Sequence, residues 1–291
     1  MFKSVKELVE ICETENKKIH EVMLEQEMSI TGLTADEVYA NMDKNLQTME
    51  NALDEGLEGV TSTTGLTGGD AVLIKNYIAS GQSLAGNTLL DAVSKAVATN
   101  EVNAAMGKIC ATPTAGSAGV VPGVLFGLKP RLNPSRKDML NFLLTSGAFG
   151  FVVANNASIS GAAGGCQAEV GSAAAMAAGA TVELAGGTPQ QSAEAFAICL
   201  KNMLGLVCDP VAGLVEVPCV KRNAAGASNA IVSADMALAG VTSRIPTDEV
   251  IEAMYKIGQT MPSALRETGR GGLAGTPTGQ RLKQEIFGDQ L

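Results

Sequence analysis

The chain has 291 residues, of which 21 are Lys or Arg, 30 are Asp or Glu and one is His, so its formal net charge is −9. This length allows one large domain or two of about 150 residues, and either can bury a sizeable core. The acidic balance argues against a nucleic-acid binder, and no run of Lys and Arg is dense enough to anchor the chain on a membrane surface.

No segment of the sequence predicts insertion into a membrane. The first residues mix charges every few positions without an apolar stretch, so we expect no signal peptide. The longest stretch without charge runs from Met139 to Ala168. A membrane span needs about 20 apolar residues, and the apolar part of this stretch, 139–154, is shorter than that. The sequence therefore predicts a soluble, cytoplasmic protein.

Helical signals follow one another along the chain, and no period-two strand of useful length occurs. Thr34 with Glu37 has the spacing of a capping box, and Thr188 precedes a proline and a glutamine at helix-starting positions. The expected helices cover 4–29 with one or two breaks, Thr34 to about Leu57, Asn87 to about Ile109, Ser135 through Val153, about 189–206, and a further helix from Thr247.

Small residues dominate the parts of the sequence between and within these helices. Aromatic residues make up only 3%, tryptophan is absent, 33 residues are glycine, and alanine is abundant over 157–240. Glycine-rich turns occur at 61–70, 112–119, 160–166 and 268–275. We expect one all-α domain over 1–291, a helical bundle with Gly/Ala-rich central helices and functional turns, in which the more charged residues 1–60 are a candidate arm.

The six cysteines divide into two kinds. In an acidic chain without a signal peptide, they point to metal binding or catalysis rather than to structural disulfides. Cys12 and Cys199 lie within amphipathic helices, and Cys110 ends a predicted helix just before a turn. Buried free cysteine packs as a small hydrophobic residue, which is the role we expect for these three.

The other three cysteines lie in turns. Cys166 follows two glycines, Cys208 precedes Asp-Pro, and Cys219 follows a proline. Such turns bring backbone N–H groups near sulfur and leave room for a bulky inorganic centre. Zinc is disfavoured, because there is no Cys-x-x-Cys and the lone histidine, His20, is expected at the surface of the N-terminal helix. The residues alone leave iron–sulfur ligation, core packing and a redox role open.

Four segments are similar to those of a known family. SISGAAGGCQAEVG (158–171) and GLVCDPVAGLVEVPCVKRNAAG (205–226) resemble the signature segments of bacterial iron–sulfur-dependent L-serine dehydratases, in particular of the α chain. TPTAGSAGVVPG (112–123) and ETGRGGLAG (267–275) are also similar to that family. The resemblance extends from about residue 15 to 275.

The resemblance implies a cofactor, a substrate and a partner. It implies that Cys166, Cys208 and Cys219 hold a [4Fe–4S] cluster, used in place of pyridoxal phosphate. One iron is then left without a protein ligand and can act as a Lewis acid on the hydroxyl of L-serine, which is converted to pyruvate and ammonia. Single-chain relatives carry an additional domain, so the resemblance implies an α subunit that works with a β subunit in a heterodimer or larger assembly.

Residues next to these cysteines are candidates for catalysis. Glu169 stands three positions after Cys166, and on a helix the two would share a face, so it is a candidate base or else a capping or pairing residue. Lys221 and Arg222 follow Cys219. We expect Lys221 in a catalytic role and Arg222 at the serine carboxylate, with charge balance for the cluster or a solvated helix start as alternatives.

Further polar residues are candidates for binding the substrate. Asn223 offers an amide, and Thr114 and Ser117 lie in a turn whose backbone N–H groups could bind a carboxylate. Two other functions stay open at this point. One is a related elimination on L-threonine or L-cysteine, and the other is a non-catalytic helical sensor that binds a cluster.

Overall fold

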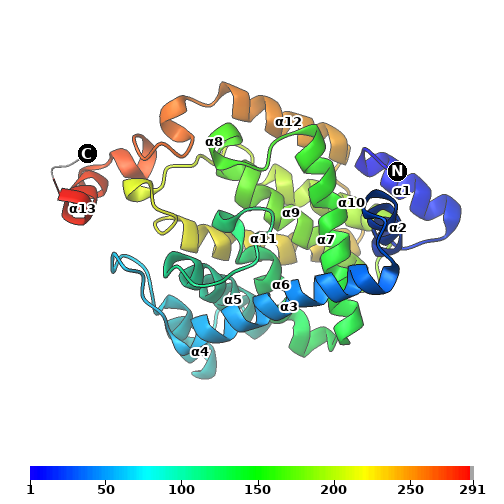
Figure 1. Ribbon diagram of the computed structural model, residues 1–291, viewed down its shortest axis with the longest axis horizontal. Coiled ribbons are helices and arrows are strands. Elements are labelled where there is room, and N and C mark those ends of the chain that lie inside the picture. Colours follow the sequence, from blue (N-terminus) through cyan, green and yellow to red (C-terminus); the bar gives the residue numbers. More distant parts are fainter. Residues whose placement is uncertain (289–291) are drawn as a thin grey trace.

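The computed structural model describes residues 1–288, and over that range it contains helices and turns but no β-strand. Strand-like pairing is limited there to two isolated bridges, Thr61 with Gly68 and Cys208 with Arg266. The predicted all-α class is therefore confirmed. The two ends of the described chain lie on opposite sides of the molecule, with α1 at one end and α13 at the other (Figure 1).

The α-helices of the described residues are, in chain order, α1 (Val5–Glu15), α2 (Ile19–Thr31), α3 (Ala35–Glu58), α4 (Asp70–Ala79), α5 (Asn87–Ala104), α6 (Val120–Leu132), α7 (Arg136–Asn156), α8 (Gly161–Gly164), α9 (Ser172–Leu184), α10 (Pro189–Lys201), α11 (Cys219–Leu238), α12 (Thr247–Thr260) and α13 (Pro277–Phe287). Short helical turns, among them η1 (Ala115–Ser117), the π-turn η2 (Gln167–Gly171) and η5 (Gly272–Gly275), interrupt the connections.

Local signals predicted several helix starts correctly. Thr34, Ser135 and Thr188 each cap a helix within a reciprocal capping box. The start of α5 differs, because Gly86 occupies the cap position and makes no side-chain hydrogen bond. This helix also ends at Ala104 rather than near 109, since Met106 adopts a left-handed conformation that a helix cannot contain.

Two further boundaries differ from expectation. Cys110, expected at a helix end, lies beyond α5 in an irregular connection and is half-buried. The helix that contains Cys199 ends at Lys201 rather than near 206, and the chain then turns through Gly205 at a φ of 84°. Gly205 lies four residues beyond the helix end, and it adopts this left-handed conformation without a clash because it has no Cβ.

The helix α9 runs through the centre of the molecule, among α6, α7, α10 and α11 (Figure 1). Residues 172–182 are all buried, and most of them are alanine. Because a helix of small residues has a narrow profile, its neighbours can approach its backbone closely. The expectation of Gly/Ala-rich central helices is therefore confirmed at α9.

Glycines allow backbone contact between α5 and α6. A Cβ placed on Gly123 would lie 2.6 Å from the Cβ of Ala96, and one on Gly127 would lie 2.7 Å from the backbone nitrogen of Ala92. Such distances are far shorter than a normal carbon contact. The two helices can therefore pack at this spacing only with glycine at both positions.

The charged N-terminal segment packs onto the same body. Buried residues of α1, α2 and α3 belong to the main hydrophobic core. The carboxylate of Asp248 accepts hydrogen bonds from the first N–H groups of α1, those of Val5 at 2.8 Å and Lys6 at 3.0 Å. Within residues 1–288, no helix is both long and apolar enough to cross a membrane.

The close approach of α5 and α6 gives a first prediction. We expect Gly127→Ala to lower the free energy of unfolding by about 1–3 kcal/mol, because overpacking forces backbone shifts. Gly147→Ala in α7 is the matched control, since a Cβ there meets nothing within 4 Å. It should raise stability slightly, because alanine favours helix over glycine by about 1 kcal/mol. Urea unfolding measures both, and a stable Gly127→Ala variant would contradict the packing argument.

Candidate functional site

The three turn cysteines come together at one end of the bundle. Cys166 immediately precedes η2, Cys208 lies in the connection between α10 and α11, and Cys219 is the first residue of α11. All three side chains are buried, with exposed fractions of 3%, 4% and 8%. Their segments lie near the glycine-rich loop before α4 and the connection before α13, on the left in Figure 1.

The thiols of these cysteines influence one another. Burial raises the pKa of Cys166 to about 11 and that of Cys219 to about 12. Burial also raises the pKa of Cys208, and the neighbouring Cys166 and Cys219 raise it further. Without a metal the thiols are therefore protonated at neutral pH, and metal binding would release protons. The charge of Arg222 opposes the rise in pKa at Cys166 and Cys219.

The segment before α13 runs alongside Cys208. The backbone N–H of Cys208 donates to the carbonyl of Leu265 at 2.9 Å, and its carbonyl accepts from the N–H of Glu267 at 2.7 Å. Glu267 has a φ of 62°, an uncommon conformation for a residue with a side chain. This pairing brings the ETGRGGLAG segment to the cysteines, a contact that the sequence did not predict.

An ion pair between Arg222 and Asp209 ties the segments together. Arg222 Nη2 lies 2.8 Å from Asp209 Oδ1, and Arg222 Nη1 donates to the carbonyl of Val207 at 2.8 Å. The other carboxylate oxygen of Asp209 accepts from the N–H of Leu273 at 2.7 Å. The contact at Oδ1 is a close charge pair rather than an aligned hydrogen bond. Asp209 is a site residue that the sequence did not predict.

Glu169 lies beside the cysteines, as the sequence suggested, but in a π-turn rather than in an α-helix. Its Oε2 is 4.0 Å from the sulfur of Cys208. Burial raises the pKa of this carboxyl group, and a hydrogen bond from the Thr114 hydroxyl partly opposes the rise. A Cβ on Gly161 would lie 2.6 Å from Glu169 Oε2 and 2.9 Å from the Cys208 sulfur, so this glycine leaves room for both groups.

Asn223 is fully buried, and its amide is used in the protein's own structure. Its Nδ2 donates to the carbonyls of Gly116 at 2.8 Å and Cys219 at 2.9 Å, and its Oδ1 accepts from the N–H of Gly119 at 3.1 Å. It therefore fixes the turn at η1 against the start of α11. A contact between this amide and a substrate would require one of these bonds to break.

The turn that contains Thr114 and Ser117 is also held internally. The hydroxyl of Ser117 donates to the carbonyl of Thr112 at 3.1 Å, and the two candidate hydroxyls lie 3.2 Å apart. Ser117 is fully buried, whereas Thr114 is half-buried and reaches Glu169. Of the two residues, Thr114 is therefore the one that contacts the carboxylate beside the cysteines.

The adjacent cations Lys221 and Arg222 point to different surroundings. Lys221 forms an ion pair with Asp70 at the start of α4, and its side chain is 60% exposed. The side chain of Arg222 is only 16% exposed and faces the cysteine segments. Successive residues on a helix point about 100° apart, so only one of the two can face the site.

A second buried carboxylate lies just before Cys219. Glu216 is 5% exposed, and it accepts hydrogen bonds from the hydroxyls of Ser62 at 2.6 Å and Thr64 at 2.8 Å. These contacts fasten the glycine-rich loop before α4 to the cysteine segment. Ser62 and Thr64 lie in the glycine-rich turn at 61–70, and nothing in the sequence marked Glu216 as their partner.

The lone histidine lies outside this site. The sequence predicted it at the surface, but the structure places it largely below the surface. The side chain of His20 is 13% exposed, and its Nδ1 lies 2.9 Å from Oε1 of Glu183. The same carboxylate accepts the N–H of Ile19 at 2.6 Å, at the start of α2. This pair therefore joins α2 to α9.

The donors at this end of the bundle are arranged differently from those of a single-metal site. In the described part of the chain, no three His, Cys, Asp or Glu side chains converge as they would on a single metal ion. A four-iron cluster takes one thiolate per iron, so its ligands need not meet at one point. Three buried thiols from three segments fit such a group better than they fit zinc, which usually takes four protein ligands at a structural site.

The comparisons with known proteins point to one family. The profile described as "Serine dehydratase alpha chain" matches residues 14–274. A probable L-serine dehydratase alpha chain of Bacillus subtilis is 72% identical over 291 residues, covering all of this chain and 97% of the relative. An L-serine dehydratase alpha chain of Peptoniphilus asaccharolyticus is 44% identical over 99% of each chain. An L-serine dehydratase of Haemophilus influenzae is 36% identical over 94% of this chain but only 61% of the relative.

The contrast between the mostly buried Arg222–Asp209 ion pair and the exposed Lys221–Asp70 ion pair gives a second prediction. Asp209→Asn should lower the free energy of unfolding by about 2–4 kcal/mol, because it leaves the mostly buried Arg222 without its counter-charge. Asp70→Asn is the control, because it breaks the largely exposed pair with Lys221 and should cost at most about 1 kcal/mol. Thermal and urea unfolding at neutral pH would measure both. Equal losses of stability in the two variants would show that the ion pair of Arg222 with Asp209 does not hold the cysteine segments together.

Proposed function

The chain belongs to the serine dehydratase alpha chain family, and from this premise we propose that it is the α subunit of a lyase that converts L-serine to pyruvate and ammonia. The length of the match supports the proposal, because it includes every segment of the cysteine site. A cytoplasmic setting fits the six free cysteines, since reducing compartments keep thiols reduced.

We propose that Cys166, Cys208 and Cys219 hold a [4Fe–4S] cluster. The observation that carries the proposal is the meeting of three buried thiols from separate turns beside the cation of Arg222. When bound, such a cluster supplies one iron without a protein ligand, which can act as a Lewis acid toward the serine hydroxyl. Its excess negative charge is partly balanced by Arg222.

Glu169 is the proposed base. Its burial and raised pKa suit a carboxylate that takes a proton from the Cα of serine and holds it on Oε2. Loss of hydroxide from Cβ then gives aminoacrylate, which tautomerises to an imine and hydrolyses to pyruvate and ammonia. Thr114 orients the carboxylate of Glu169 through its hydroxyl.

The remaining candidates are assigned supporting roles. Asn223 and Ser117 keep the turn at η1 in place, where the backbone N–H groups face the serine carboxylate in our proposal. Arg222 positions the cysteine segments through Asp209. No contact with serine is assigned to Lys221, because its ammonium group pairs with Asp70.

We also propose that the chain requires a β subunit. Support comes from the Haemophilus influenzae relative, of which this chain matches only 61%. The rest of that relative lies outside the match, and in our proposal a separate chain supplies its role. A partner surface would complete the site and exclude water from it.

The cysteine assignment gives the third prediction. After anaerobic reconstitution with iron and sulfide, Cys166→Ser, Cys208→Ser and Cys219→Ser should each lose most of the bound iron, together with ammonia release from L-serine. Cys110→Ser is the control, because this half-buried thiol lies outside the three segments and should leave iron unchanged. Pyridoxal phosphate should restore nothing. Full iron content in Cys208→Ser would refute the ligand set.

The partner gives the fourth prediction. Titrating the reconstituted chain with its β chain at a fixed L-serine concentration should make pyruvate formation rise and then level off at a fixed ratio. L-threonine and L-cysteine, tested in parallel, should react more slowly than L-serine. Full turnover by this chain alone, unaffected by the second chain, would contradict the need for a partner. Bound cluster without turnover at any ratio would favour a sensor instead.

A further inference from the structure

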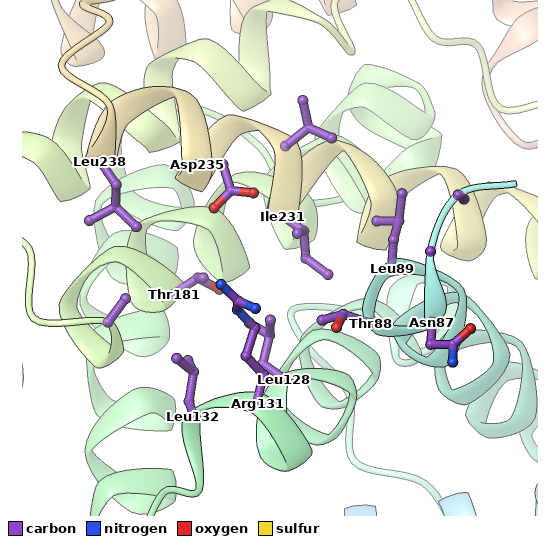
Figure 2. A pocket seen from close by; sticks show the side chains of 14 residues that line it. Asn87, Thr88, Leu89, Leu128, Arg131, Leu132, Thr181, Ile231, Asp235 and Leu238 are labelled. Carbon is purple, nitrogen blue, oxygen red and sulfur yellow. The ribbon is translucent and has the colours of Figure 1, made fainter. Parts of the chain in front are cut away.

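A cavity of about 450 Å³ lies away from the cysteines, among α5, α6, α9 and α11 (Figure 2). Small-molecule pockets are typically about 300–1,000 Å³. No residue of the three cysteine segments lines it. The nearest lining residue along α11, Ile231, lies twelve positions beyond Cys219, which is about 18 Å at about 1.5 Å per residue.

Two opposite charges face this cavity without forming an ion pair. Arg131 rises from the end of α6, and Asp235 lies above it on α11 (Figure 2). Within residues 1–288, neither side chain makes an ion pair or a side-chain hydrogen bond. The cavity therefore offers a free cation and a free anion to one ligand.

Thr181 is an independent observation that points to a polar ligand. This residue of α9 lines the cavity, is only 5% exposed, and its hydroxyl has no hydrogen-bond partner in the described structure. A buried hydroxyl without a partner costs free energy. A polar group of a bound molecule would remove that cost.

The first turn of α5 provides further N–H donors. The cavity is lined by Gly86, Asn87, Thr88 and Leu89, and Gly86 makes no capping hydrogen bond. The first N–H groups of a helix lack partners within the helix and attract negative charge. The α5 end of the cavity therefore favours an anionic group.

The rest of the wall is apolar. Leu128 and Leu132 come from α6, and Ile231 and Leu238 come from α11. Apolar side chains of a ligand gain free energy by leaving water against such a wall. Serine and pyruvate are too small and too polar to use it.

We propose that this cavity binds a free α-amino acid with an aliphatic side chain. Its carboxylate is bound by Arg131 and the N–H groups of α5, and its ammonium group is bound by Asp235. The hydroxyl of Thr181 bonds the same polar end, and the side chain packs against the leucines and the isoleucine. A dicarboxylate is disfavoured by Asp235, and a diamine by Arg131. The site is independent of the proposed reaction.

The test is calorimetric titration of the full chain with L-leucine. We expect L-leucine to bind. Two analogues should bind at least about tenfold more weakly, because each loses a charged contact. They are 4-methylpentanoate, which lacks the ammonium group, and 3-methylbutylamine, which lacks the carboxylate. L-Serine should bind more weakly than L-leucine. Arg131→Gln and Asp235→Asn should each weaken L-leucine binding at least about tenfold. Thr181→Val should weaken it less, because a neutral hydrogen bond is worth less than a charged one.

A control variant and a stability measurement separate loss of the site from loss of the fold. Arg244→Gln removes an exposed arginine that does not line the cavity, and it should leave binding unchanged. Each variant's melting temperature is compared with that of the unaltered chain, and retained stability excludes misfolding. Absence of L-leucine binding at millimolar concentration would overturn the proposal, as would equal binding of the two analogues. Loss of binding on adding the β chain would show that the cavity is a subunit contact and would also overturn it.

Discussion

Arg222 lies where the three cysteine-bearing segments meet, and the geometry of the site depends on its contacts. It stands in the first turn of α11, close to Cys219, and pairs with Asp209, which follows Cys208. It also donates to the backbone at Val207 and lies close enough to Cys166 to oppose the rise in that thiol's pKa that burial causes. One charged group thus holds segments that the chain itself joins only through long connections. A mostly buried guanidinium can do this because it offers several donors in a fixed plane.

The sequence was informative where structure depends on near neighbours. Capping residues such as Thr34 and Ser135 predicted helix starts, because their partners stand three positions away. The turn cysteines differed visibly from Cys199, which lies in a helix, because glycine and proline lie beside them. The all-α class followed from the repeated helical pattern and the lack of strand-like alternation.

What the sequence did not predict depends on contacts between distant positions. Glu216 binds Ser62, 154 positions earlier, and Asp209 binds Leu273, 64 positions later. No local pattern marks such pairs. Lys221 and Arg222 looked equivalent in the sequence, and only the orientation of α11 separates the exposed cation from the buried one.

The backbone contacts of α5 with α6 restrict how this fold can vary. In an ordinary core, hydrophobic residues of similar volume replace one another with small losses of stability. At Gly123 and Gly127 no such exchange exists, because the space that a methyl group would need is occupied by the facing helix. We expect mutational drift to be confined to the outer helix faces and the loops. New specificities would therefore evolve through the turns, on a helical framework that changes little.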